Sequence, residues 1–143
     1  MTTNAIERYQ NSPELQSAFP EIEPGAKPLG SRILVQLKTV GKKTKSGLIL
    51  VEETKEVEQY NTQVARVIRV GPIAYHNRDT GKPWPEGTWA KPGDFVRVPR
   101  FGGDRWEVVI NEAGEKALFC VFNDHEVITE ITGDPLTFAT YVK

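Results

Sequence analysis

The chain has 143 residues, a hydrophobic content of 38%, a charged content of 26% and a net charge of −1. This composition is typical of a globular protein with one core, and the mixed charges lack the basic patch of a nucleic-acid binder. No apolar run approaches the roughly 18 residues of a membrane span, and a single cysteine, Cys120, excludes an internal disulfide. We therefore expect a protein of a reducing compartment, the cytoplasm, with neither nucleic acid nor a membrane as partner.

The first expected element is a short helix near the N-terminus. Ser12 and Pro13 form a helix start, with Ser as the N-cap and Pro at the first helical position, and the helix would end near Phe19. Residues 134–135 repeat this start near the C-terminus. Residues 32–37 predict a first strand whose odd-numbered side chains share one face.

A long polar segment, residues 39–62, follows this strand and contains a short apolar run. The run is Leu48, Ile49, Leu50 and Val51, and Gly47 precedes it. These residues show neither the alternation of a half-buried strand nor the stripe of a helix. They predict either a hook on a mobile tether, which would dock into an apolar groove of a partner, or a brief buried strand.

Five further short strands are expected after this segment. They are residues 64–70, 95–98, 105–110, 117–122 and 127–131. Turn residues at 91–94, 112–115 and 123–126 separate them, and the second of these turns makes a hairpin. Trp106 alternates with Val108 and is expected in the core. Six short strands and one hairpin indicate an all-β fold, a small β-barrel.

Five segments in register resemble the GroES family of co-chaperonins. They are Pro28-Leu-Gly-Ser-Arg-Ile-Leu-Val35, Lys45-Ser-Gly-Leu-Ile-Leu50, Val67-Ile-Arg-Val-Gly71, Lys91-Pro-Gly-Asp-Phe-Val96, and Phe101-Gly-Gly with Glu107-Val108. They are similar to the family's opening strand, its mobile-loop motif of a glycine before three branched apolar residues, its valine-glycine strand end, its lysine-x-glycine-aspartate turn and its aromatic-glycine-glycine segment. The resemblance implies a GroES-like barrel over residues 28–131, with an N-terminal extension, residues 1–27, and a C-terminal tail, residues 132–143.

The resemblance also implies a function. The chain would form a homo-heptamer that caps a GroEL-type chaperonin in a nucleotide-dependent way and encloses an unfolded client protein. Residues 39–62 would be the mobile loop, in which Leu48, Ile49 and Leu50, flanked by Gly47 and Val51, bind the chaperonin. The protein would need no cofactor and no metal, because the partner chaperonin binds and hydrolyses ATP. The first strand, residues 32–37, would pair with residues 127–131 of a neighbouring subunit.

The resemblance makes residues 72–91 the roof loop of the lid. This segment holds Tyr75, Trp84 and Trp89, whose side chains would either line the chamber roof or pack along their own loop. Phe101 would face the chamber or pack in its turn. The terminal extensions and the long roof loop are departures from the family pattern, and they resemble virus-encoded co-chaperonins, whose enlarged chambers suit a large capsid subunit.

Three other functions could use a fold of this kind. Zinc-dependent alcohol dehydrogenases contain a domain of this fold, but His76, Cys120 and His125 lack ligand spacing and the chain has no G-x-G-x-x-G motif. An enzyme is therefore not expected. A monomeric β-barrel adaptor and a viral structural protein remain alternatives, because either could use the apolar loop to bind another protein.

Overall fold

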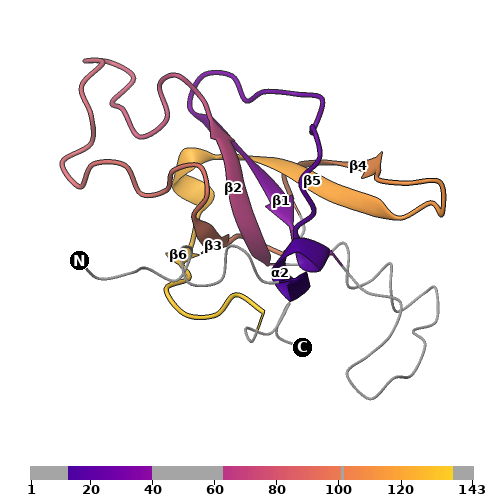
Figure 1. Cartoon of the computed structure of the whole chain (residues 1–143). Coiled ribbons are helices and arrows are strands. Elements are labelled where there is room, and N and C mark those ends of the chain that lie inside the picture. Colours follow the sequence, from indigo (N-terminus) through magenta and orange to yellow (C-terminus); the bar gives the residue numbers. More distant parts are fainter. Residues whose placement is uncertain (1–12, 40–62, 101, 137–143) are drawn as a thin grey trace.

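The computed structural model describes residues 13–39, 63–100 and 102–136. They form a short helix, α2 (Pro13–Ala18), and one antiparallel sheet with the strand order β4-β5-β1-β2-β3-β6 (Figure 1). The strands are β1 (Arg32–Leu37), β2 (Val64–Val70), β3 (Phe95–Arg97), β4 (Asp104–Val109), β5 (Lys116–Asn123) and β6 (Thr129–Glu130). The predicted all-β fold is confirmed, and the expected helix lies where the Ser-Pro start placed it.

The last strand is shorter than predicted. The expected turn after β5 is a 3-10 helix, η1 (Asp124–Glu126), in which the Glu126 carboxylate accepts hydrogen bonds from the backbone and side-chain amides of Asn123. The chain returns to β3 only when the Ile128 N–H donates to the Arg97 carbonyl. Regular pairing is therefore limited to two residues of β6.

Strand β1 lies in the middle of the sheet. It pairs along its length with β2 on one side and with β5 on the other, with a bulge opposite Leu34 and Val35. The expectation that β1 pairs with the last strand of a neighbouring subunit is therefore wrong, because both of its hydrogen-bonding edges are used within the chain. Among the described strands, β4 and β6 are the edges of the sheet.

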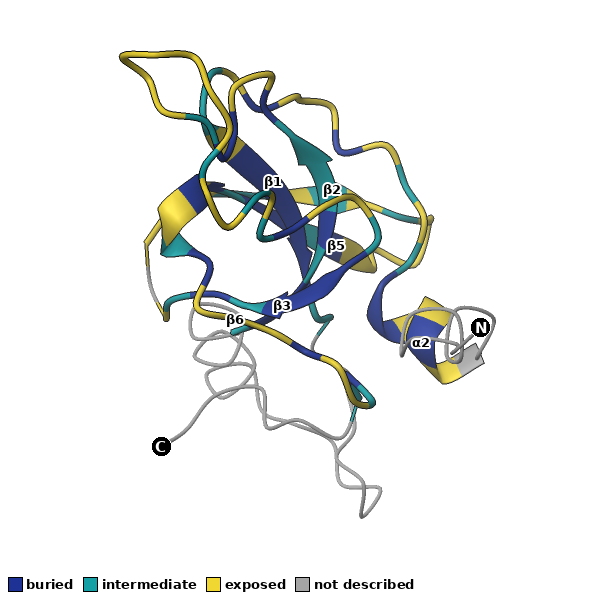
Figure 2. Cartoon of the chain, turned by 90° about the vertical axis from the view of Figure 1, so that its left-hand side faces the viewer, coloured by how far each residue is buried: buried dark blue, intermediate teal, exposed yellow. Residues whose placement is uncertain are grey.

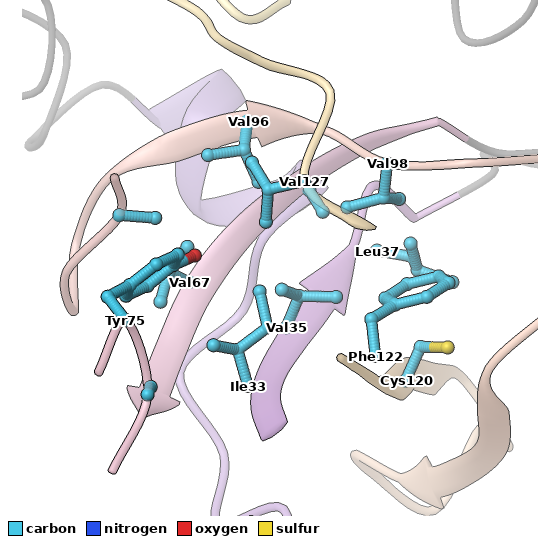
Figure 3. Packing of buried hydrophobic residues seen from close by; sticks show 13 residues of the cluster. Ile33, Val35, Leu37, Val67, Tyr75, Val96, Val98, Cys120, Phe122 and Val127 are labelled. Carbon is cyan, nitrogen blue, oxygen red and sulfur yellow. The ribbon is translucent and has the colours of Figure 1, made fainter. Parts of the chain in front are cut away.

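One face of the sheet surrounds the interior core, which we call the interior cluster (Figure 3). Alternate residues of β1, β2, β3 and β5 supply most of it, as the period of two in a strand requires. Its buried members are Ile33, Val35, Leu37, Ala65, Val67, Ala74, Tyr75, Ala90, Val96, Val98, Cys120, Phe122 and Val127. Figure 2 shows the resulting buried centre of the sheet, with exposed residues concentrated in the loops.

The opposite, outer face of the sheet is covered by the N-terminal segment. Residues 19–27, which we call the strap, run across it and place Ile22 against a cluster around Leu34 and Phe119. The indole N–H of Trp106 donates to the Pro24 carbonyl at 2.9 Å, and the Trp106 ring stacks on Phe119. Trp106 is therefore packed on the outer face and is only partly buried, and it is not part of the interior core.

The strap also provides hydrogen-bond partners for two polar residues of the outer face. Gln36 is buried in the central strand, and its side-chain amide donates to the Pro20 carbonyl at 2.8 Å. Arg69 donates to the Ala26 carbonyl and forms an ion pair of 2.9 Å with Glu23. Because a buried polar group such as the Gln36 side-chain amide needs a partner, the strap is an integral part of this fold.

Candidate functional site

The two ends of the long polar segment, residues 39–62, lie side by side at one end of the sheet. The Lys38 N–H donates to the Val64 carbonyl at 2.9 Å, and Leu37 pairs with Ala65. We call Lys38–Thr39 and Gln63–Val64 the loop roots. The predicted binding residues Gly47, Leu48, Ile49, Leu50 and Val51 lie outside the described residues, so the roots are what the structure shows of this site.

The second root is tied to β3 by polar contacts. The Val98 N–H donates to the Gln63 carbonyl at 2.8 Å, and the Gln63 side-chain amide donates to the Val98 carbonyl at 3.3 Å. The Arg97 guanidinium donates to the Gln63 side-chain oxygen at 3.2 Å. Any segment between the roots therefore begins and ends on well-paired backbone.

An apolar cluster, the root cluster, packs beside these roots. It joins α2 and the strap to β2, β3 and the C-terminal segment that follows β6. Its members are Leu15, Ala18, Phe19, Val64, Phe95 and Ile131, with Leu136 partly buried against them. The rings of Phe19 and Phe95 meet edge to face with their centroids 5.2 Å apart. Figure 1 shows α2 beside the end of β1 and the start of β2, where the roots lie.

Residues 72–91, the predicted roof loop, form a folded hairpin. His76 and Pro83 make an isolated bridge, and Asn77 turns the tip by accepting the Asp79 and Thr80 amides with its side-chain oxygen. At its base the Trp84 N–H donates to the Tyr75 carbonyl at 3.0 Å. This loop therefore has a defined conformation of its own.

The three predicted aromatic residues of this loop meet one another. Tyr75 contacts Trp84 at 5.2 Å and Trp89 at 5.8 Å between ring centroids, and the two indoles lie 4.9 Å apart. Tyr75 is buried in the interior cluster, and both tryptophans pack against that cluster while partly exposed. The three side chains therefore pack along their own loop, and both tryptophans keep partly exposed surface.

Tyr75 is held in an unusual backbone conformation by a residue that the sequence did not single out. Its φ of 62° lies in the left-handed region, which is costly for a side chain of this size. The buried Asp124 carboxylate accepts the Tyr75 N–H at 2.8 Å and so fixes this conformation. Burial, followed by the Asp124 and Asp94 carboxylates, raises the pKa of the Tyr75 hydroxyl to about 12.

The described side chains offer little that could perform chemistry. Within residues 13–39, 63–100 and 102–136, no group of three or more His, Cys, Asp or Glu is placed to hold a metal ion. Burial raises the pKa of the Cys120 thiol to about 12, so the reactive thiolate is suppressed. None of the helices in that part of the chain has the length and apolar character that crossing a membrane requires. Phe101, the candidate chamber-facing residue, lies outside the described residues.

The sequence therefore indicated the two ends of the polar segment and the aromatic residues of segment 72–91, but neither the root cluster nor the role of Asp124. A signal for the root cluster was present, because Leu15 and Phe19 are four residues apart and share one face of the predicted helix. No comparable signal marks Asp124, whose partner is 49 residues away in the chain.

Known proteins match most of the chain. The family model described as the chaperonin 10 kDa subunit, Cpn10, matches residues 25–131. The mitochondrial 10 kDa heat shock protein of Saccharomyces cerevisiae is 36% identical over 107 residues, which cover 75% of this chain and 89% of the relative. The co-chaperonin GroES of Methylacidiphilum infernorum is 34% identical over 112 residues, which cover 78% of this chain and 99% of the relative.

The matched region contains the six strands of the described residues and both loop roots. Helix α2 and the first part of the strap precede it, so most of the cover on the outer face lies outside the family match. The family is one of co-chaperonins and not one of enzymes.

Proposed function

The chain belongs to the family of 10 kDa chaperonin subunits, and from that premise we propose that this co-chaperonin forms a seven-membered lid for a GroEL-type chaperonin. The lid binds in a nucleotide-dependent way and encloses an unfolded client protein. ATP is bound and hydrolysed by the chaperonin. The observation that carries the proposal is the family match over residues 25–131. The cytoplasm is the proposed compartment, and cell fractionation tests it.

The apolar run in the segment between the roots is the proposed contact with the chaperonin. Burying each of Leu48, Ile49 and Leu50 contributes about 1.5–3 kcal/mol, and Gly47 and Val51 flank them. Ordering the segment costs about 1–2 kcal/mol for each residue fixed, so one segment alone binds weakly. Seven copies on one ring raise the effective concentration and bind firmly while each contact stays reversible.

The ring itself uses the edges of the sheet. Strand β1 is paired on both sides, whereas β6 lies at an edge next to the exposed side chain of Ile128. We propose that residues 127–131 pair with a segment of the neighbouring subunit other than β1. This pairing would satisfy an edge that is otherwise open to unwanted partners.

The folded hairpin of residues 72–91 is the proposed roof of the chamber. Its aromatic base holds it on the interior cluster through Tyr75, so the hairpin projects as a firm element. Trp84 and Trp89 keep partly exposed faces that an enclosed client can meet. Phe101 is the further candidate for such a contact.

The test of the hook replaces Ile49 by Ser and measures binding to a double-ring chaperonin with ADP by biolayer interferometry. We expect binding to be lost because seven apolar contacts are removed from each ring at once. The control is Ile73→Ser, which makes the same change at an exposed position in the roof loop, and it should bind as the unmodified chain does. Undiminished binding by Ile49→Ser would refute this role for the apolar run.

A further inference from the structure

Both loop roots are held by parts of the chain that lie outside the barrel strands. The Thr39 N–H donates to the carbonyl of Ala18, the last residue of α2, at 2.8 Å. The Lys38 ammonium donates to the Leu136 carbonyl at 3.4 Å. The first root is thus joined to the N-terminal helix by its backbone and to the C-terminal segment by its side chain.

The second root is held by apolar packing in the root cluster. Val64 is fully buried in the root cluster together with Phe19 and Phe95. Ile131 and Leu136 complete that cluster from the C-terminal side. Segments more than 100 residues apart in the sequence therefore meet at the point where the polar segment leaves and re-enters the barrel.

Covering the outer face does not require α2 to lie beside the loop roots. The strap alone covers the cluster around Leu34, through Ile22 and the Trp106–Pro24 hydrogen bond. Helix α2 packs instead at the end of the sheet that carries the roots, and it contributes a backbone acceptor to one of them. Its placement indicates a second role besides covering apolar surface.

We propose that α2, the adjoining Phe19 and residues 131–136 form a clamp that fixes the loop roots, and that Phe19 is a positioning residue for chaperonin binding. This inference rests on the proposed function of the segment between the roots. With the clamp closed, residues 38–39 are already ordered before binding. With the clamp open, Lys38 keeps its hydrogen bond to the Val64 carbonyl, but binding must order Thr39 as well, which weakens one contact by roughly tenfold.

The clamp is tested by comparing Phe19→Ala with Ile22→Ala. Both variants truncate an apolar side chain of the N-terminal segment, but Ile22 packs in the cluster around Leu34, away from the roots. Hydrogen exchange of the Thr39 amide is measured on the free chain, and affinity for a double-ring chaperonin with ADP is measured by biolayer interferometry. Phe19→Leu, a milder change, serves if Phe19→Ala does not fold.

We expect Phe19→Ala to speed exchange at Thr39 at least tenfold and to weaken chaperonin binding at least tenfold, while Ile22→Ala leaves both unchanged. Fast exchange at Thr39 with unchanged binding would overturn the positioning role. Equal weakening by Ile22→Ala would overturn it too, because general loss of stability would then explain the effect.

The failures of the clamp and of the proposed function can be told apart. If the unmodified chain binds no chaperonin, the proposed function fails, and with it the role of Phe19 in binding. Hydrogen exchange of the Thr39 amide still tests in that case whether the clamp orders the first root. Protection of Thr39 that is lost in Phe19→Ala supports the clamp, and an unprotected Thr39 in the unmodified chain refutes it.

Discussion

The two faces of the sheet are buried by different parts of the chain. The interior face is filled by the strands themselves and by Tyr75 of the hairpin of residues 72–91, all within the region that the family model matches. The outer face is covered by the strap, most of which precedes residue 25, where that match begins, and α2 packs in the root cluster at one end of the sheet. The shared region thus builds the barrel, and the added N-terminal segment buries the second face and reaches the loop roots.

Truncation of the interior face should have the largest effect on stability. Ile33 is fully buried in β1, the central strand, and Ile33→Ala leaves a cavity that the paired strands on both sides cannot close. We expect a loss of about 2–5 kcal/mol in the free energy of unfolding, measured by urea denaturation. If Ile33→Ala lowered the free energy of unfolding by less than Ile22→Ala on the outer face does, the interior face would not be the more stabilising of the two.

A smaller effect is expected where the strap meets the outer face. Trp106→Phe keeps a ring to stack on Phe119 but removes the hydrogen bond to the Pro24 carbonyl. We expect a loss of about 1 kcal/mol, together with faster proteolysis of the strap in the native state. Unchanged proteolysis would show that this hydrogen bond does not hold the strap down.

The interior face also contains one polar group that its core does not need. The Tyr75 hydroxyl is buried and has no hydrogen-bond partner in the described part of the protein. Tyr75→Phe removes this group and keeps the ring contacts with Trp84 and Trp89, so we expect stability to be unchanged or raised by up to about 1 kcal/mol. Thermal unfolding measures this change in stability. A clear loss of stability in Tyr75→Phe would reveal a hydrogen-bond partner for the hydroxyl.

The smallest effect is expected at the ion pair of the strap. The hydrogen bond from Arg69 holds the pKa of the Glu23 carboxyl below its usual value, and both side chains are well exposed. A lowered folded-state pKa stabilises the protein above the pKa of the unfolded state, and this stabilisation is lost as the pH falls through the folded-state pKa. Glu23→Gln should therefore lower the free energy of unfolding only slightly at pH 7 and not at all at pH 2.

Urea midpoints at the two pH values measure this difference, and added salt at pH 7 should reduce it because the pair is exposed to solvent. A larger difference between the two proteins at pH 2 than at pH 7 would contradict the assigned direction of the pKa shift.

The interior face could be predicted from the sequence because it depends on local patterns. Alternation placed Ile33, Val35 and Leu37 on one face, and the turn at residues 91–94 was expected from Pro, Gly and Asp. Trp106 followed the same alternation, but alternation cannot say which of two faces is the interior. Its partners, Phe119 and the Pro24 carbonyl, belong to the outer face.

The outer face and the site were harder to predict because they depend on contacts between distant residues. Ser12 and Pro13 predicted the helix, but nothing local indicated that it would pack against Phe95 and Ile131. The strained backbone of Tyr75 depends on Asp124, which no pattern linked to it. The pairing of β1 with a neighbouring subunit was wrong because the strand order of the sheet, with β5 beside β1, could not be read from the order of segments.

The most direct test of the co-chaperonin lid is size-exclusion chromatography with light scattering, run with a double-ring chaperonin in the presence and absence of ADP. We expect a ring of seven times the 16.0 kDa subunit, about 112 kDa, that elutes with the chaperonin only when nucleotide is present. A monomer that never elutes with the chaperonin would refute the lid and favour a single-barrel adaptor that binds a different protein.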